Sequence, residues 1–382
     1  MKTSLLVLDP KGDTELILRR PNLDKHKEPN QEEPAVESDS AAVEADSPET
    51  VNGEPPTDKT VIDVFCDRSA STHEPADVQG LKPYDENFQP VEIRFRVSSA
   101  HLILASPVFK AMLDGPFSET VRNERGLYEI KAFEWNAEAL LILLDIIHGH
   151  HRSAPKAVDL NMLEQMALLV DYYQCHEIVE IFADKWVAAH RDAIPQDYSK
   201  SCLSWMFVAW VFSANDLFNS MVSVILKHSR SPVQTNLPIP NTILEKVESR
   251  RQSLVDQIID NLYGMLESLW ATTDGCSVEC SCMLLGSLMK QMREGGFEIP
   301  KPAGRIAQEK SVVEWRRFVS GLNSPTWRTD RSFGTPKHEC SFKDKTQPWM
   351  DDMGRTFMNG IRFENFHTTK SSPNKVSSPE AQ

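Results

Sequence analysis

The sequence lacks any hydrophobic run long enough to cross a bilayer. The apolar stretches Leu140–Leu144 and Trp205–Phe212 fall far short of the roughly 20 residues that a membrane helix needs. Near the amino terminus only Leu5–Leu8 are consecutively apolar, too few for the hydrophobic region of a secretory signal. We therefore expect no membrane partner and a cytoplasmic or nuclear location, or both.

The sequence also lacks an excess of positive charge. Its 41 Lys and Arg residues stand against 55 Asp and Glu, which gives a formal net charge of -14. Binding to nucleic acid depends on a surplus of Lys and Arg over the contact surface, so we expect no nucleic-acid partner. The seven cysteines are odd in number and scattered, which is typical of reduced thiols rather than of a disulfide framework.

Motifs of common catalytic sites are missing as well. The chain has no glycine-rich phosphate loop, no His-Glu-x-x-His sequence and no nucleophile elbow. We predict that the protein is not an enzyme.

The composition divides the chain of 382 residues into folded and unfolded parts. Between Pro21 and Thr60 there are 11 acidic residues, 3 lysines, six prolines and no aromatic residue. Such a segment cannot bury enough apolar surface to offset its ordering entropy. The predicted division is a first hairpin at 1–20, an acidic disordered insert at 21–88, a domain at 89–192, a helical domain at 198–366 and a disordered tail at 367–382.

The folded parts show strand and helix patterns. Residues 3–18 predict a hairpin around Asp9–Asp13, and Val91–Val97 alternates between apolar and charged residues, as a half-buried strand does. Short strands are also suggested at residues 61–65 and 128–130. Helices are predicted from Ser98 or Ser99 to Leu113, from the cap Asn136 to about 149, and at 162–173 and 178–186. Strands followed by clustered helices indicate an α+β fold.

Residues 95–113, FRVSSAHLILASPVFKAML, resemble the signature of the BTB/POZ domain family. Residues 139–149 and 168–175 look like later helices of the same domain, as found in filamentous-fungal BTB proteins. The resemblance covers residues 3–18 and about 91–190, and implies a small sheet with clustered helices. The signature residues, His101, Leu104, Ser106 and Phe109, are expected to be structural. For His101 we expect a satisfied core or capping histidine rather than a ligand.

The resemblance also implies protein partners. BTB domains self-associate, and many bridge a cullin scaffold of ubiquitin ligases to a substrate; cullin-binding members resemble one another in a hydrophobic-x-acidic motif, which here corresponds to Phe117, Ser118 and Glu119. An aromatic anchor beside a carboxylate suits an interface hot spot, whereas the alternative is an ordinary helix-terminating loop. No long helix precedes the first strand, which leaves a strand-swapped homo-oligomer an open alternative.

The carboxyl-terminal part predicts helices at 200–230, 247–271 and 283–292, followed by apolar residues at 349–366 that dock onto them. Soft metal ligands occur in two clusters, Cys276-x3-Cys280-x-Cys282 and His338-x-Cys340. A structural Zn²⁺ held by Cys276, Cys280, His338 and Cys340, with Cys282 as a substitute, is one interpretation. The other is that these cysteines are buried small hydrophobes. We expect no other cofactor.

Three histidines, His148, His150 and His151, follow a predicted helix. They are expected to contact solvent or the carbonyl groups at the helix end rather than a metal.

Together these features predict an adaptor whose amino-terminal domain offers the family interface and whose helical region holds a substrate or partner. The alternatives are a scaffold, possibly associated with transcription, that self-associates without a cullin, and a zinc-dependent binding module supported by the BTB part.

Overall fold

The computed structural model describes residues 3–23, 78, 80–271, 274–303, 310–326 and 340–367. Most of the acidic insert predicted at 21–88 lies outside these residues, as do the strand suggested at 61–65, His338 and residues 368–382 of the tail. Of the insert, residues 21–23, 78 and 80–88 are described. Val78 is buried, and the side-chain amide of Asn22 donates to the carbonyl of Leu81, so both ends of the insert pack on the folded domain.

Four strands form one mixed sheet. The strands are β1 (Thr3–Val7), β2 (Thr14–Arg19), β3 (Glu92–Val97) and β4 (Tyr128–Phe133), in the order β1-β3-β2-β4. β3 runs parallel to β1 and antiparallel to β2, and β4 runs parallel to β2. The hairpin predicted at residues 3–18 is therefore wrong. Both of its strands exist, but β3, which follows the acidic insert, lies between them.

The two faces of the sheet follow the alternation of the sequence. On β3, Ile93, Phe95 and Val97 are buried in the core. On β2 and β3, the carboxylates of Glu15 and Glu92 are also buried, and each forms an ion pair with Arg94. Arginine side chains therefore cover the outer face of the sheet and neutralise its carboxylates.

The helix predicted from residue 98 to 113 is two helices, α1 (Ser99–Ala105) and α2 (Pro107–Asp114). The break has a local cause, since Pro107 has no N–H to continue the helical hydrogen bonds of α1. Ser106 takes an extended conformation, and its hydroxyl accepts a hydrogen bond from the backbone N–H of Phe109, which caps α2.

Three further helices complete the amino-terminal part: α3 (Ala137–Ile147), α4 (Leu160–Tyr173) and α5 (His176–Ala189). The predicted cap Asn136 is confirmed, because its side-chain oxygen accepts a hydrogen bond from the N–H of Ala139. α3 is buried on nearly every side, so it forms the centre of the helical layer.

The carboxyl-terminal part is helical, as predicted, and the α+β fold class with a helical region after it is confirmed. Its helices are α6 (Ser201–Val211), α7 (Asn215–His228), α8 (Asn241–Trp270), α9 (Val278–Glu294), α10 (Val312–Ser320), α11 (Phe342–Thr356) and α12 (Glu364–His367). The last apolar segment docks as expected: the ring of Phe363 lies 5.4 Å from that of Phe218 on α7, between ring centres.

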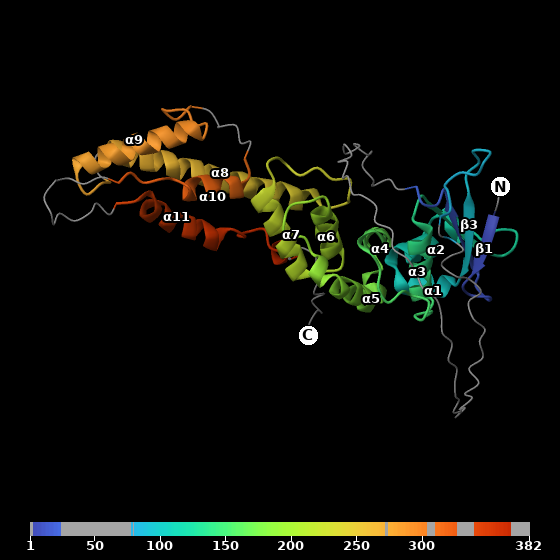
Figure 1. The fold of residues 1–382 in the computed structure, drawn as a ribbon. Coiled ribbons are helices and arrows are strands. Elements are labelled where there is room, and N and C mark those ends of the chain that lie inside the picture. Colours follow the sequence, from blue (N-terminus) through green and yellow to red (C-terminus); the bar gives the residue numbers. More distant parts are fainter. Residues whose placement is uncertain are drawn as a thin grey trace, which may run out of the picture.

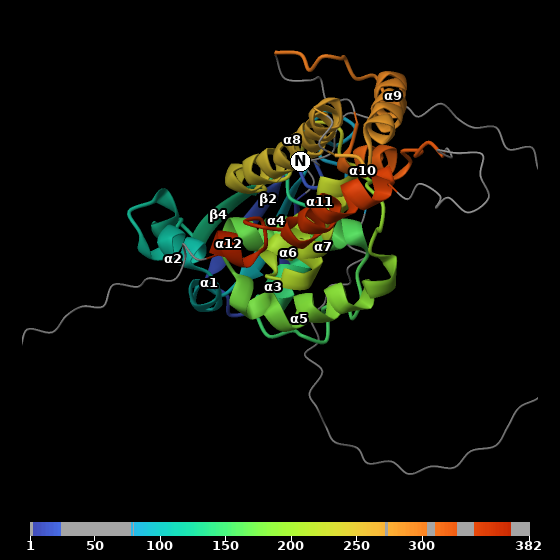
Figure 2. The same ribbon diagram turned by 90° about the vertical axis from the view of Figure 1, so that its left-hand side faces the viewer.

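The molecule is elongated, with the sheet and α1–α3 at one end and α8, α9 and α11 extending to the other (Figure 1). Figure 2 views it from the end formed by α8–α11. α4 packs against α6, and one cluster of buried apolar residues runs from the sheet into the carboxyl-terminal helices. Among the described residues, no helix is both long enough and apolar enough to span a bilayer.

Candidate functional site

The three residues of the hydrophobic-x-acidic motif lie in a tight turn after α2. Phe117 caps the 3-10 helix η2 (Ser118–Thr120), and its carbonyl accepts a hydrogen bond of 2.6 Å from the Thr120 hydroxyl. The Ser118 hydroxyl donates to the Glu119 carboxylate at 2.9 Å. The Phe117 side chain is 53 % exposed. The turn thus fixes the backbone while it leaves an aromatic ring at the surface.

Two features keep this turn in place. Gly115, at the end of α2, leaves no room for a side chain, since an added Cβ would clash with the Ala111 carbonyl. After the turn, the Arg122 guanidinium lies 4.2 Å from the centre of the Tyr128 ring on β4. Val121, which lies in the sequence between η2 and Arg122, is exposed. The surface formed by Phe117, Ser118, Glu119 and Val121 is called the η2 surface below.

The signature residues divide into two groups. Ser106 and Phe109 are buried, as a structural role requires. Besides capping α2, the Ser106 hydroxyl donates to the backbone carbonyl of Tyr173, and the Phe109 ring stacks on the Tyr173 ring at 4.3 Å between centres. This pair therefore joins α2 to the end of α4.

The other two signature residues, His101 and Leu104, are at the surface, so neither lies in the core. His101 is exposed, and its ring meets that of His148 edge to face at 5.1 Å. Leu104 is 86 % exposed, whereas Leu102 is fully buried. Because α1 has only seven residues, one narrow stripe faces the core, and Leu102 occupies it.

The histidines after α3 contact the helix end, as the sequence predicts. His148 Nδ1 lies 2.8 Å from the Leu144 carbonyl oxygen, and His150 Nδ1 lies 3.1 Å from the Asp145 carboxylate. His151 is exposed, and its ring lies 5.4 Å from that of Phe182. These contacts account for all three rings as parts of the fold.

Sequence reasoning missed a cavity of about 310 Å³ beside β4. Aromatic side chains line much of it, among them Phe133, Trp135 and Tyr172. Phe133 and Tyr172 are exposed, and β4 is an edge strand of the sheet. The signal in the sequence is the density of aromatic residues directly after β4 and at the end of α4.

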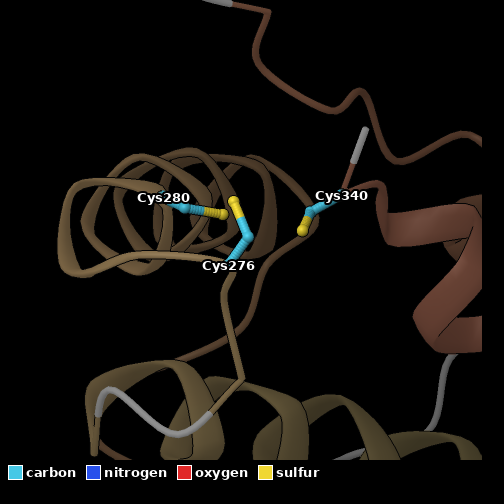
Figure 3. A group of neighbouring side chains, drawn as sticks. All are labelled: Cys276, Cys280 and Cys340. Carbon is cyan, nitrogen blue, oxygen red and sulfur yellow. The ribbon is translucent and has the colours of Figure 1, made fainter. Parts of the chain in front are cut away.

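Three of the predicted zinc ligands come together. The sulfur atoms of Cys276, Cys280 and Cys340 all lie within 4.8 Å of one another (Figure 3). Cys276 precedes α9, Cys280 lies in its first turn, and Cys340 directly precedes the cap of α11. Cys282, the substitute ligand, is exposed and does not belong to this group, and His338 lies outside the described residues.

The surroundings of Cys280 favour its neutral thiol form. Burial raises the pKa of its thiol to about 11, and the neighbouring sulfur atoms of Cys276 and Cys340 contribute to the increase. A nucleophilic cysteine needs the opposite, a lowered pKa. Cys280 is therefore suited to packing or to metal binding rather than to nucleophilic attack.

The comparisons with known proteins identify one part of the chain. Residues 87–188 match the family model described as the BTB/POZ domain. This range contains β3, β4 and α1 to α4 with most of α5, while β1 and β2 lie before it in the same sheet. No curated protein matches the chain.

Proposed function

The chain carries a BTB/POZ domain, and from this premise we propose that it is a non-catalytic adaptor that joins a cullin scaffold to a second protein. BTB/POZ domains are typically interaction modules without catalytic activity, so an adaptor role in protein–protein interaction follows from the family. The finer assignment has two parts: the η2 surface contacts the cullin, and the helical region binds the partner. Ubiquitin transfer would then belong to the recruited ligase, in the cytoplasm or nucleus.

The exposed ring of Phe117 is the observation that carries the cullin assignment. A large apolar side chain held at the surface by a fixed turn is typical of an interface anchor. Glu119 lies two residues later in the same turn, is half-buried, and its carboxylate accepts a hydrogen bond from the Ser118 hydroxyl. Since the backbone of the turn is already ordered, little conformational entropy would be lost on binding.

The partner site is proposed at the far end of the helical region. Trp270 ends α8 and is 69 % exposed, while Val278 and Met283 are exposed on α9. These side chains belong to the two helices that meet at the tip of the molecule opposite the sheet (Figure 1). An exposed tryptophan is among the strongest interface anchors, which supports a protein-binding role for this tip.

Binding of the purified full-length protein to a cullin amino-terminal domain tests the proposal. Replacement of Phe117 and Glu119 by Ala is expected to abolish binding. Phe88→Ala is the matched control, because Phe88 is an equally large and even more exposed ring outside the η2 surface. Both variants should keep the thermal midpoint within a few degrees. Unchanged binding by the double variant would contradict the cullin assignment.

A second candidate function is a scaffold that self-associates without a cullin. It is favoured by the position of β4, an edge strand beside the aromatic cavity, because an edge strand offers backbone groups to another chain. Light scattering during size-exclusion chromatography would distinguish the two. The scaffold requires a dimer that Phe133→Lys converts to a monomer, whereas the adaptor requires only that cullin binding depend on Phe117.

A further inference from the structure

We propose that Cys276, Cys280 and Cys340 bind a structural Zn²⁺ that fastens the start of α11 to the start of α9. Their sulfur atoms lie within 4.8 Å of one another and point toward a common centre (Figure 3). In a tetrahedral zinc site with bonds of about 2.3 Å, thiolates lie roughly 3.8 Å apart. The three side chains therefore need only small adjustments to surround an ion.

Core packing explains Cys280 and in part Cys340, but not Cys276. Cys280 is fully buried and continues the apolar stripe formed by Leu284, Leu288 and Met292 on α9. Cys340 is half-buried and packs against the same core, whereas Cys276 is exposed. A small hydrophobe gains little at an exposed position. Their convergence on the buried sulfur of Cys280 is what a metal site predicts.

The backbone around the cluster is held by several independent contacts. The Ser277 hydroxyl accepts a hydrogen bond of 3.2 Å from the N–H of Cys280 and caps α9. Gly275 leaves no space for a side chain, because an added Cβ would clash with the Ser281 hydroxyl. The position of Cys276 relative to Cys280 is thus fixed by a tight loop.

An ion pair holds the start of α11 against the loop before α9. Lys345, in the second turn of α11, lies 2.6 Å from the carboxylate of Asp274 in the loop before α9. At the start of α11, the N–H of Phe342 donates a hydrogen bond of 2.8 Å to the Ser324 hydroxyl. These contacts hold Cys340 opposite Cys276 and Cys280, although it lies some 60 residues later in the sequence.

The chemistry of the cluster favours zinc. Zn²⁺ accepts thiolate ligands in a tetrahedral site and has no redox chemistry, and on binding it displaces the thiol protons. Three thiolates around Zn²⁺ leave one coordination position for a further ligand.

The test is metal analysis of the full-length protein, purified in reducing buffer without chelator. We expect about one equivalent of zinc per chain, and on replacement by Co²⁺ a thiolate-to-metal charge-transfer band. Cys276→Ser and Cys340→Ser should each lose stoichiometric zinc and that band. Cys282→Ser is the matched control and should retain both, because Cys282 is exposed and lies outside the cluster.

Three results would overturn the proposal: no stoichiometric metal and no cobalt charge-transfer band in the wild-type protein, equal loss in the Cys282→Ser variant, or retention of zinc by a folded Cys276→Ser variant. Cys276 is the most informative position because its side chain is exposed, so replacement leaves the core unchanged. Circular dichroism of each variant shows whether it is folded.

Discussion

The backbone N–H of Ser98 donates a hydrogen bond of 3.0 Å to Nε2 of His148, 50 residues later at the end of α3. The other ring nitrogen donates to the Leu144 carbonyl, so the imidazole is neutral and bridges α3 to the start of α1. Burial, together with the nearby His101 and His150, lowers the pKa of His148 to about 4. Protonation of Nε2 would remove the acceptor for Ser98.

This arrangement predicts a loss of stability in weak acid. In the unfolded chain His148 has its ordinary pKa of about 6.5, so between pH 6.5 and 4 the unfolded state binds a proton that the folded state does not. The contribution is fully present above pH 6.5 and falls away as the pH drops to 4, by on the order of 3 kcal/mol. Urea unfolding at pH 7 and pH 4.5 measures it.

His148→Gln removes the titrating group while it keeps a side chain that forms hydrogen bonds. The variant should be less stable than the wild type at pH 7 but should lose less stability between pH 7 and 4.5. An identical pH dependence in both proteins would show that His148 does not titrate in the way described.

Substitutions in α1 distinguish the buried from the exposed leucine. Leu102→Ala should lower the free energy of unfolding by about 2–5 kcal/mol, because it leaves a cavity in the core. Leu104→Ala should change it by less than about 0.5 kcal/mol, since the side chain is 86 % exposed. Chemical denaturation of the two variants provides the comparison, and equal losses would contradict the assigned orientation of α1.

The carboxylate of Glu15 predicts a second stability effect. It is only 2 % exposed and lies 3.0 Å from Arg94 and 2.8 Å from Arg125. Glu15→Gln should cost about 1–3 kcal/mol, because charge-assisted hydrogen bonds to a buried carboxylate are lost: Arg125 loses this partner, and Arg94 keeps only Glu92. Glu124→Gln, at an exposed position in the same domain, is the control and should be nearly neutral. Similar unfolding curves for both variants would rule out this role for Glu15.

Trp270 provides a prediction for the helical region. Trp270→Ala should remove the partner proteins that co-purify with the chain while cullin binding is retained, because the residue is exposed at the end of α8 and lies outside the BTB/POZ domain. Quantitative mass spectrometry of both purifications measures the change. Loss of the cullin together with the partners would instead indicate general unfolding or a single shared interface.

The sequence predicted local structure more accurately than it predicted which strands pair. The strand at 91–97 and the cap Asn136 depend on neighbouring residues, and both are present. The hairpin at 3–18 was wrong because β3 enters the sheet from beyond the insert, a long-range event that turn chemistry does not report. The prediction of a single helix at 98–113 was wrong because Pro107 has no backbone N–H with which to continue the helix.

The site residues show the same difference between what residue type indicates and what long-range packing determines. Residue type alone identified Cys276, Cys280 and Cys340, but only the packing of α9 and α11 brings them together and leaves Cys282 outside. The exposure of Leu104 depends on how the short helix α1 is oriented against the core, which residue type does not report. The exposure of Phe117 likewise depends on the turn geometry of η2, which a three-residue motif cannot specify.

Affinity purification of the tagged full-length protein from its own cells, followed by mass spectrometry, tests the adaptor function most directly. The proposal predicts recovery of a cullin with its RING partner, lost in the Phe117→Ala, Glu119→Ala double variant and kept in Phe88→Ala. Consistent absence of a cullin, with only further copies of this chain or chromatin proteins recovered, would contradict the adaptor and leave the self-associating scaffold.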